Sequence, residues 1–125
     1  MQTAAVVGFF GFAWLTLFQL MLAAGMPLGH MAWGGANRIL PRGQRFASLV
    51  SAGLAVLALW TLVQAAGWAA GPIPMVWIAP LLWGFAGLFG LSLLLNLFGA
   101  KGIERLHGVP LTCLCAGSCL YLALA

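Results

Sequence analysis

The chain has 125 residues, of which 64% are hydrophobic and 5% are charged, and its mean hydropathy is +1.10. A soluble domain has about 25% charged residues, so this composition excludes an ordinary water-soluble protein, whose surface it could not cover. The formal net charge is +4, from one acid, Glu104, and five cations: Arg38, Arg42, Arg45, Lys101 and Arg105. They lie in two short segments between apolar runs, which favours topology signals over a nucleic-acid-binding face.

Four apolar runs are each about as long as a membrane-spanning helix, which needs roughly 20 apolar residues. They cover about 4–25, 46–68, 73–99 and 108–125. We therefore expect an all-α protein, a polytopic bundle of four transmembrane helices forming a single membrane domain over 1–125. The connections 26–45 and 100–107 carry every Lys and Arg, and the connection near Gly71 carries none. The positive-inside rule then predicts that 26–45 and 100–107 are cytoplasmic loops and that both termini face the non-cytoplasmic side.

Small residues three or four positions apart indicate close helix packing, because they let helix backbones approach each other in lipid. The first run has Gly8 and Gly11, the second has small residues from Ala47 to Ala55, and the third has Gly84, Ala86, Gly87 and Gly90. The same pattern serves packing within the chain or between two copies, and we favour packing within the chain. Pro80 is expected to bend the third helix.

Polar residues within the runs converge on one side of the membrane. Gln19 and Asn96 fall in the cytoplasmic halves of their spans, near the glycine-rich first loop that contains His30, Trp33, Gly34 and Gly35. Such a loop and its arginines could contact the phosphate of an anionic lipid. The predicted ligand or headgroup site at the cytoplasmic face comprises Gln19, His30, Trp33, Gly34, Gly35, Arg38, Arg42, Arg45, Asn96, Glu104, Arg105 and His107.

The inventory of catalytic groups is small. The chain contains no Asp and one Glu, which rules out paired carboxylates, a Ser–His–Asp set and an oxygen-rich Mg²⁺ or Ca²⁺ site. Glu104 suits a helix N-terminus or an ion pair with an arginine. His30 and His107 could form an acid–base pair. We predict no cofactor, and an enzymatic role stays open but is not favoured.

Soft ligands offer one weaker metal alternative. Met21, Met26, His30 and Met31 cluster at the end of the first run, and thioethers with imidazole suit Cu(I). Of the three cysteines, Cys115 and Cys119 share a helix face whereas Cys113 points elsewhere. We interpret all three as small hydrophobic residues, and we predict no metal site.

One stretch carries a resemblance to known proteins. The segment from Pro27 to Gly35, then Leu40-Pro41 and the residues Arg45 through Ser48, resembles small four-span bacterial inner-membrane proteins of uncharacterised activity. In those proteins the third span ends in Asn, followed by a Ser-rich basic stretch, Glu-Arg, and a Pro that opens the last span. Here Asn96, Glu104, Arg105 and Pro110 follow that order, but the Ser-rich stretch is replaced by Gly99-Ala100-Lys101-Gly102. The resemblance implies a topology and no activity.

Two functions remain open from the sequence. The first is an accessory, assembly or self-associating subunit of the inner membrane, which acts by helix packing against itself or other membrane subunits. The alternative is a small transporter or lipid-handling protein that uses the polar cluster at the cytoplasmic face. The alternative requires a cavity beside Gln19, Asn96 and the loop 29–35, and a solidly packed interior there would exclude it.

Overall fold

Helices make up the fold of residues 2–125, the part of the chain that the computed structural model describes. The long helices are α1 (Gln2–Ala23), α2 (Arg42–Ala65), α3 (Met75–Phe98) and α4 (Gly102–Leu124). Two short 3-10 helices, η1 (Gly29–Met31) and η2 (Trp33–Gly35), lie between α1 and α2. All four long helices are long and apolar enough to cross a membrane. This confirms the expected all-helical class and indicates a multi-pass membrane protein.

Two helices begin earlier than the apolar runs suggested. α2 starts at Arg42, directly after Pro41, as proline is well tolerated at helix starts. α4 starts at Gly102, so the expected loop 100–107 is mostly helical and Pro110 lies inside the helix rather than opening it. Gly102 turns the chain into α4 with a φ of +58°. Glu104 lies in the first turn of α4, where its negative charge interacts favourably with the positive end of the helix dipole.

Glycines end the first two helices. Gly25 adopts a φ of +90° and Gly67 a φ of +73°, and this left-handed conformation costs glycine little. After α1, the amide of Met26 donates to the carbonyl of Met21 (3.1 Å), and after α2 the amide of Trp68 donates to Val63 (3.1 Å). These bonds satisfy carbonyl groups that the helix leaves unpaired.

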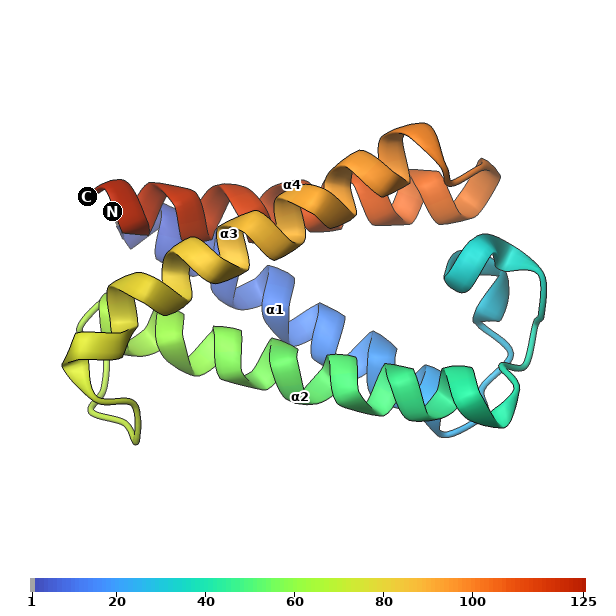
Figure 1. Cartoon of the computed structure of the whole chain (residues 1–125), viewed down its shortest axis with the longest axis horizontal. Coiled ribbons are helices and arrows are strands. Elements are labelled where there is room, and N and C mark those ends of the chain that lie inside the picture. Colours follow the sequence, from blue (N-terminus) through green and yellow to red (C-terminus); the bar gives the residue numbers. More distant parts are fainter. Residues whose placement is uncertain (1) are drawn as a thin grey trace.

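The helices form two hairpins, α1 with α2 and α3 with α4, which pack together mainly along α1 and α4. α2 and α3 make few contacts and diverge from the turn that joins them (Figure 1). The two termini lie at the same end as this turn, and the other two connections lie at the opposite end (Figure 1). At the terminal end, Trp68 Nε1 donates to Gln2 Oε1 (2.6 Å), which ties the start of α1 to the end of α2.

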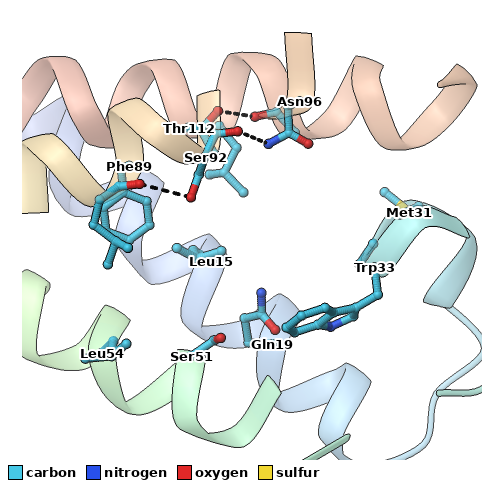
Figure 2. Close-up of a pocket in the computed structure, with 14 residues that line it drawn as sticks. Leu15, Gln19, Met31, Trp33, Ser51, Leu54, Phe89, Ser92, Asn96 and Thr112 are labelled. Atoms are coloured by element: carbon cyan, nitrogen blue, oxygen red, sulfur yellow. Dashed lines mark hydrogen bonds between the residues drawn. The ribbon is translucent and has the colours of Figure 1, made fainter. Parts of the chain in front are cut away.

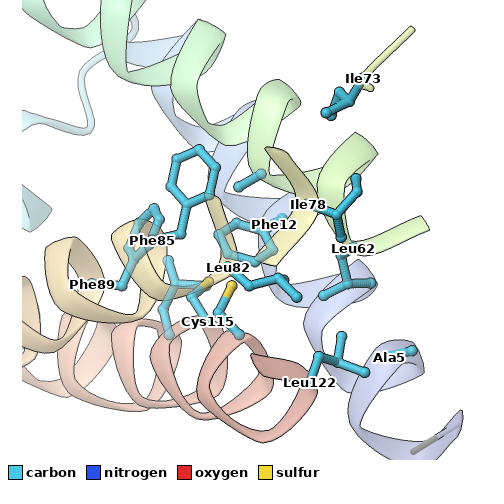
Figure 3. Packing of buried hydrophobic residues seen from close by; sticks show 13 residues of the cluster. Ala5, Phe12, Leu62, Ile73, Ile78, Leu82, Phe85, Phe89, Cys115 and Leu122 are labelled. Atoms are coloured by element: carbon cyan, nitrogen blue, oxygen red, sulfur yellow. The ribbon is translucent and has the colours of Figure 1, made fainter. Parts of the chain in front are cut away.

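The main core lies in the half of the bundle nearer the termini. It contains Phe12 of α1, Leu62 of α2, Phe85 of α3 and Cys115 of α4 (Figure 3). The rings of Phe12 and Phe89 meet edge to face with centroids 5.1 Å apart. Since this core ends near Phe89, the other half of the bundle has fewer large side chains between its helices.

The small residues divide into two groups. Gly8, Gly11, Ala52 and Ala55 are buried between helices, as expected for packing within the chain. Gly84 and Gly87 instead lie on the exposed side of α3, and a Cβ there, as at Gly90, would meet open space. The expectation of packing within the chain is therefore right for α1 and α2 and wrong for the α3 glycines, because no neighbouring side chain approaches them.

Candidate functional site

A cavity of about 270 Å³ lies between the four helices at the end of the bundle that carries the cations. Residues from each long helix and from the η1–η2 segment surround it (Figure 2). The lining residues are Leu15, Gln19, Met31, Ala32, Trp33, Ser51, Leu54, Leu88, Phe89, Ser92, Asn96, Gly108, Leu111 and Thr112. The cavity thus brings together three of the predicted site residues: Gln19, Trp33 and Asn96.

The η1–η2 segment folds back toward the helices because its backbone is tightly paired. The amide of Gly29 donates to the carbonyl of Arg38 (2.7 Å). A Cβ at Gly29 would collide with the carbonyl of Asn37, so only glycine fits this crossing. Beneath the segment, Leu40 packs with Phe18 and Leu22 of α1 in a small cluster of their own. This cluster holds the segment against the end of the bundle.

Trp33 forms the wall of the cavity on the loop side. Its φ of +52° is left-handed, which costs a residue with a Cβ about 1–2 kcal/mol. Its indole Nε1 donates to Ser48 Oγ on α2 (3.0 Å), and Ser48 is fully buried. Strained backbone at a bulky residue persists only where the surroundings fix it, and here the hydrogen bond to α2 and the packing of η1 do so.

On the α3–α4 side, the polar groups bond to their own helices. Ser92 Oγ donates to Leu88 O (3.1 Å), Asn96 Nδ2 donates to Ser92 O (2.9 Å), and Thr112 Oγ1 donates to Gly108 O (2.6 Å) (Figure 2). The side-chain amide of Asn96 rests against Gly108, where a Cβ would collide with it. Each of these side chains therefore already donates a hydrogen bond within its own helix.

On the α1–α2 side of the cavity, two of the polar lining side chains lack hydrogen-bond partners among residues 2–125. Gln19 Oε1 is buried without a hydrogen bond, and Ser51 also makes no side-chain hydrogen bond there. Both line the cavity, Gln19 from α1 and Ser51 from α2 (Figure 2). A buried polar group without a partner costs about 1–3 kcal/mol, so a ligand that supplies a partner recovers that cost.

The predicted cations take different positions. Arg45 Nε donates to the carbonyl of Ala23 (3.0 Å), which caps the end of α1. Arg38, Arg42 and Arg105 are exposed and none of them lines the cavity.

Glu104 lies beside the backbone of Gly35, with Oε2 3.5 Å from the position that a Cβ on that glycine would take. No ion pair joins Glu104 to an arginine in the described part of the chain. Of its two expected structural roles, the structure therefore shows the placement at a helix N-terminus and not the ion pair. For Gly34 the structure gives a backbone position within η2.

The two histidines have separate environments. His107 accepts a hydrogen bond from Trp14 Nε1 (2.8 Å), and its ring lies tilted against that of Phe18 with centroids 4.6 Å apart. It lines an open groove on the α1–α4 surface, not the cavity. His30 lies in η1, and its Nδ1 is buried without a partner. An acid–base pair between them gains no support from these contacts.

The candidate metal ligands also lie in different surroundings. Met31 lines the cavity and packs against the Leu40 cluster, whereas Met26 is exposed. Cys115 and Cys119 are buried in the main core and Cys113 is exposed, as expected from their spacing. Among residues 2–125, no three His, Cys, Asp or Glu side chains gather as a metal site.

Several cavity residues could not be recognised from the sequence as site residues. Ser51 is part of the small-residue pattern of α2, and Ser92 and Thr112 are ordinary polar residues within apolar runs. Leu15, Leu54 and Leu111 carry no signal at all. The divergence of α2 from α3 decides which helix faces enclose space, and no pattern in the sequence reveals that divergence.

The chain matches no protein-family model, no curated protein and no solved structure.

Proposed function

We propose that this protein handles a membrane-borne amphiphile in the cavity at its cation-rich end, as a small lipid-handling or transport protein. The observation that carries the proposal is the cavity of about 270 Å³ that contains two unpartnered polar side chains, Gln19 and Ser51. A mostly apolar pocket with a few polar groups is the usual form of a small-molecule site. The lipid-handling alternative derived from the sequence required a cavity beside Gln19, Asn96 and the loop 29–35.

The arrangement of the helices supplies a route from the bilayer. α2 and α3 make few contacts with each other, and Leu54 of α2 and Leu88 of α3 both line the cavity while remaining partly exposed. An alkyl chain can therefore lie between these helices with its far end in lipid. The exposed Arg38 and Arg42 at the same end suit contacts with anionic headgroups of the surrounding bilayer.

We also propose an orientation and a location, both from the distribution of charge. The cation-rich end faces the cytoplasm under the positive-inside rule, which places both termini on the other side. The resemblance of the first loop to small four-span bacterial proteins supports the bacterial inner membrane as the location.

Lipid retention tests the proposed function. Ser51→Phe places a large ring in the cavity, whereas Val56→Phe places the same ring on an exposed position of α2. After gentle detergent extraction, native mass spectrometry should detect a bound lipid on the wild type and on Val56→Phe, and much less on Ser51→Phe. Equal retention by all three proteins would contradict the proposal.

A second candidate function rests on α3. Gly84, Gly87 and Gly90 present open space where a Cβ would otherwise stand, and close approach over glycines is a common way for membrane helices to associate. This face favours an accessory or self-associating subunit. Gly87→Leu should dissociate a complex that Gly53→Leu, a change at an equally open position on α2, leaves intact. A lone monomer without co-purifying protein in native mass spectrometry would eliminate this candidate.

A further inference from the structure

We infer that the cavity takes the neutral, hydroxyl-bearing head of an amphiphile, held by Gln19 of α1 and Ser51 of α2. The inference rests on the proposed function and adds the chemical class of the ligand. A long-chain alcohol or an acylglycerol belongs to this class, whereas a fatty acid anion or an alkylammonium ion does not.

The lining of the cavity decides the charge of the head. Its fourteen residues include no ionisable side chain, and every cation at this end lies outside it. A charged head buried there would lose its hydration without gaining an opposite charge, and that loss is far larger than a hydrogen bond can offset. A neutral head avoids this cost.

The available hydrogen-bonding groups decide where the head lies. Ser92, Asn96 and Thr112 donate to carbonyls of their own helices, and the indole N–H of Trp33 donates to Ser48. Gln19 and Ser51 make no such bonds among residues 2–125. The head therefore binds on the α1–α2 side, and the alkyl chain lies against Leu88 and Phe89 of α3.

The unpartnered oxygen decides the functional group of the head. Gln19 Oε1 accepts hydrogen bonds and has none, so the ligand must donate. Rotation of the amide by half a turn would present its NH₂ group, which needs an acceptor. A hydroxyl group both donates and accepts, so it satisfies Gln19 in either orientation, and Ser51 takes the remaining bond.

The volume limits how much of the ligand is enclosed. A dry cavity of about 150 Å³ accommodates benzene, so a cavity of about 270 Å³ encloses a small polar head and the first part of a chain. The rest of the chain must leave between α2 and α3, where the helices are least in contact. A whole phospholipid does not fit inside.

Photolabelling with three probes tests this inference. The probes share one photoreactive alkyl chain and carry a glycerol, a sulfonate or a trimethylammonium head. They are added to the full-length protein in phosphatidylcholine nanodiscs, and labelled residues are quantified by mass spectrometry. The open α1–α4 groove lined by Val6, Phe10 and Leu114 serves as the internal reference for labelling from bulk lipid.

We expect the glycerol probe to label cavity residues well above the reference groove, and both charged probes to remain at the reference level. Gln19→Leu should lower cavity labelling by the glycerol probe by about two- to tenfold, the equivalent of one net hydrogen bond. Ser51→Ala should have a similar effect and serves if the first variant does not fold. Gln44→Leu is the matched control, because the Gln44 amide oxygen is also buried without a partner but lies outside the cavity lining.

Two other results would overturn the inference and are distinguishable. If all three probes label the cavity above the reference, the cavity holds amphiphiles without selecting a neutral head, so the proposed function stands and the inference fails. If no probe labels the cavity above the reference, both fail. Unchanged labelling in Gln19→Leu and Ser51→Ala would also exclude these two side chains as the binding groups.

Discussion

Gly8 lies where α1 crosses α4 and α2, and the crossing leaves no room for a side chain. A Cβ on Gly8 would stand 2.5 Å from Leu62 Cδ1 and 2.6 Å from Ser118 Cβ. The neighbouring helices must move to admit a methyl group. Gly84 has the opposite environment, since a Cβ there would meet nothing within 4 Å.

Replacing each of these glycines by alanine should therefore give opposite results. Gly8→Ala should destabilise the protein by about 1–3 kcal/mol through overpacking. Gly84→Ala should be neutral or stabilise it by up to about 1 kcal/mol, because alanine has the higher helix propensity. SDS-induced unfolding of the protein in detergent micelles measures both effects. Equal stability of the two variants would show that α1 does not cross its neighbours at Gly8.

Ser48 and Ser51 are one helical turn apart on α2 but have different roles. Ser48 Oγ accepts the hydrogen bond from Trp33 Nε1, whereas Ser51 faces the cavity without a partner. Ser48→Ala should lower the unfolding free energy by about 1–3 kcal/mol, because the part-buried indole N–H of Trp33 loses its acceptor. Ser51→Ala should leave the ligand-free protein within about 0.5 kcal/mol of the wild type. A matched unfolding series checks this, and the reverse order would refute the assigned hydrogen bond.

At the scale of elements, the connection between α2 and α3 depends on one side chain. Gln64 Nε2 donates to Ile73 O (2.8 Å), and Gln64 Oε1 accepts from the amide of Ile73 (3.1 Å). The pair is buried. Gln64 therefore makes both hydrogen bonds that the Ile73 backbone would otherwise need from another segment of backbone. In this way it fixes the point from which α2 and α3 diverge.

Gln64→Leu should accordingly be among the most damaging polar substitutions. It leaves the buried N–H and C=O of Ile73 without partners, at about 1–3 kcal/mol for each group. Gln44→Leu makes the same chemical change where the amide oxygen has no partner, so its cost should be below about 1 kcal/mol. The comparison uses the same unfolding measurement. A Gln64→Leu protein as stable as Gln44→Leu would rule out the clamp.

At the scale of the whole molecule, the two ends of the bundle differ in charge. One end has both termini and the uncharged turn with Gly71 and Pro72, and the other has the cation-bearing connections (Figure 1). The cavity lies at the cation-bearing end. The cavity and the clustered cations therefore lie at the same end of the bundle.

Reporter fusions in a bacterial host check the orientation of the whole molecule. Alkaline phosphatase fused after Ala69 or after Ala125 should be active, because both positions lie at the terminal end. Green fluorescent protein fused after Gly35 or after Ala100 should fluoresce, as those connections are expected in the cytoplasm. Neutralising Arg38, Arg42 and Arg45 together should weaken this bias. Active phosphatase after Gly35 would invert the proposed orientation.

The sequence alone determined the all-helical class of the protein, because amino-acid composition and the length of apolar runs do not depend on tertiary contacts. The apolar runs predicted four helices, the spacing of Cys115 and Cys119 predicted a shared face, and Gln19 and Asn96 were correctly placed at one end. Helix ends were less well determined: the segment 100–107, which carries Lys101, Glu104 and Arg105, indicated a loop, yet α4 begins at Gly102. Hydropathy reports the depth of a residue in the membrane and not whether its backbone is helical.

Tertiary structure alone decided which faces meet. The glycines of α1 and α3 follow the same spacing, yet Gly8 is enclosed and Gly84 is open. Ser51 and Gln19 share a cavity only because α2 and α3 diverge after their turn. A repeat of small residues specifies that a helix can approach another closely, but the rotation of each helix about its axis depends on all of its neighbours together. That rotation determined where this protein encloses space.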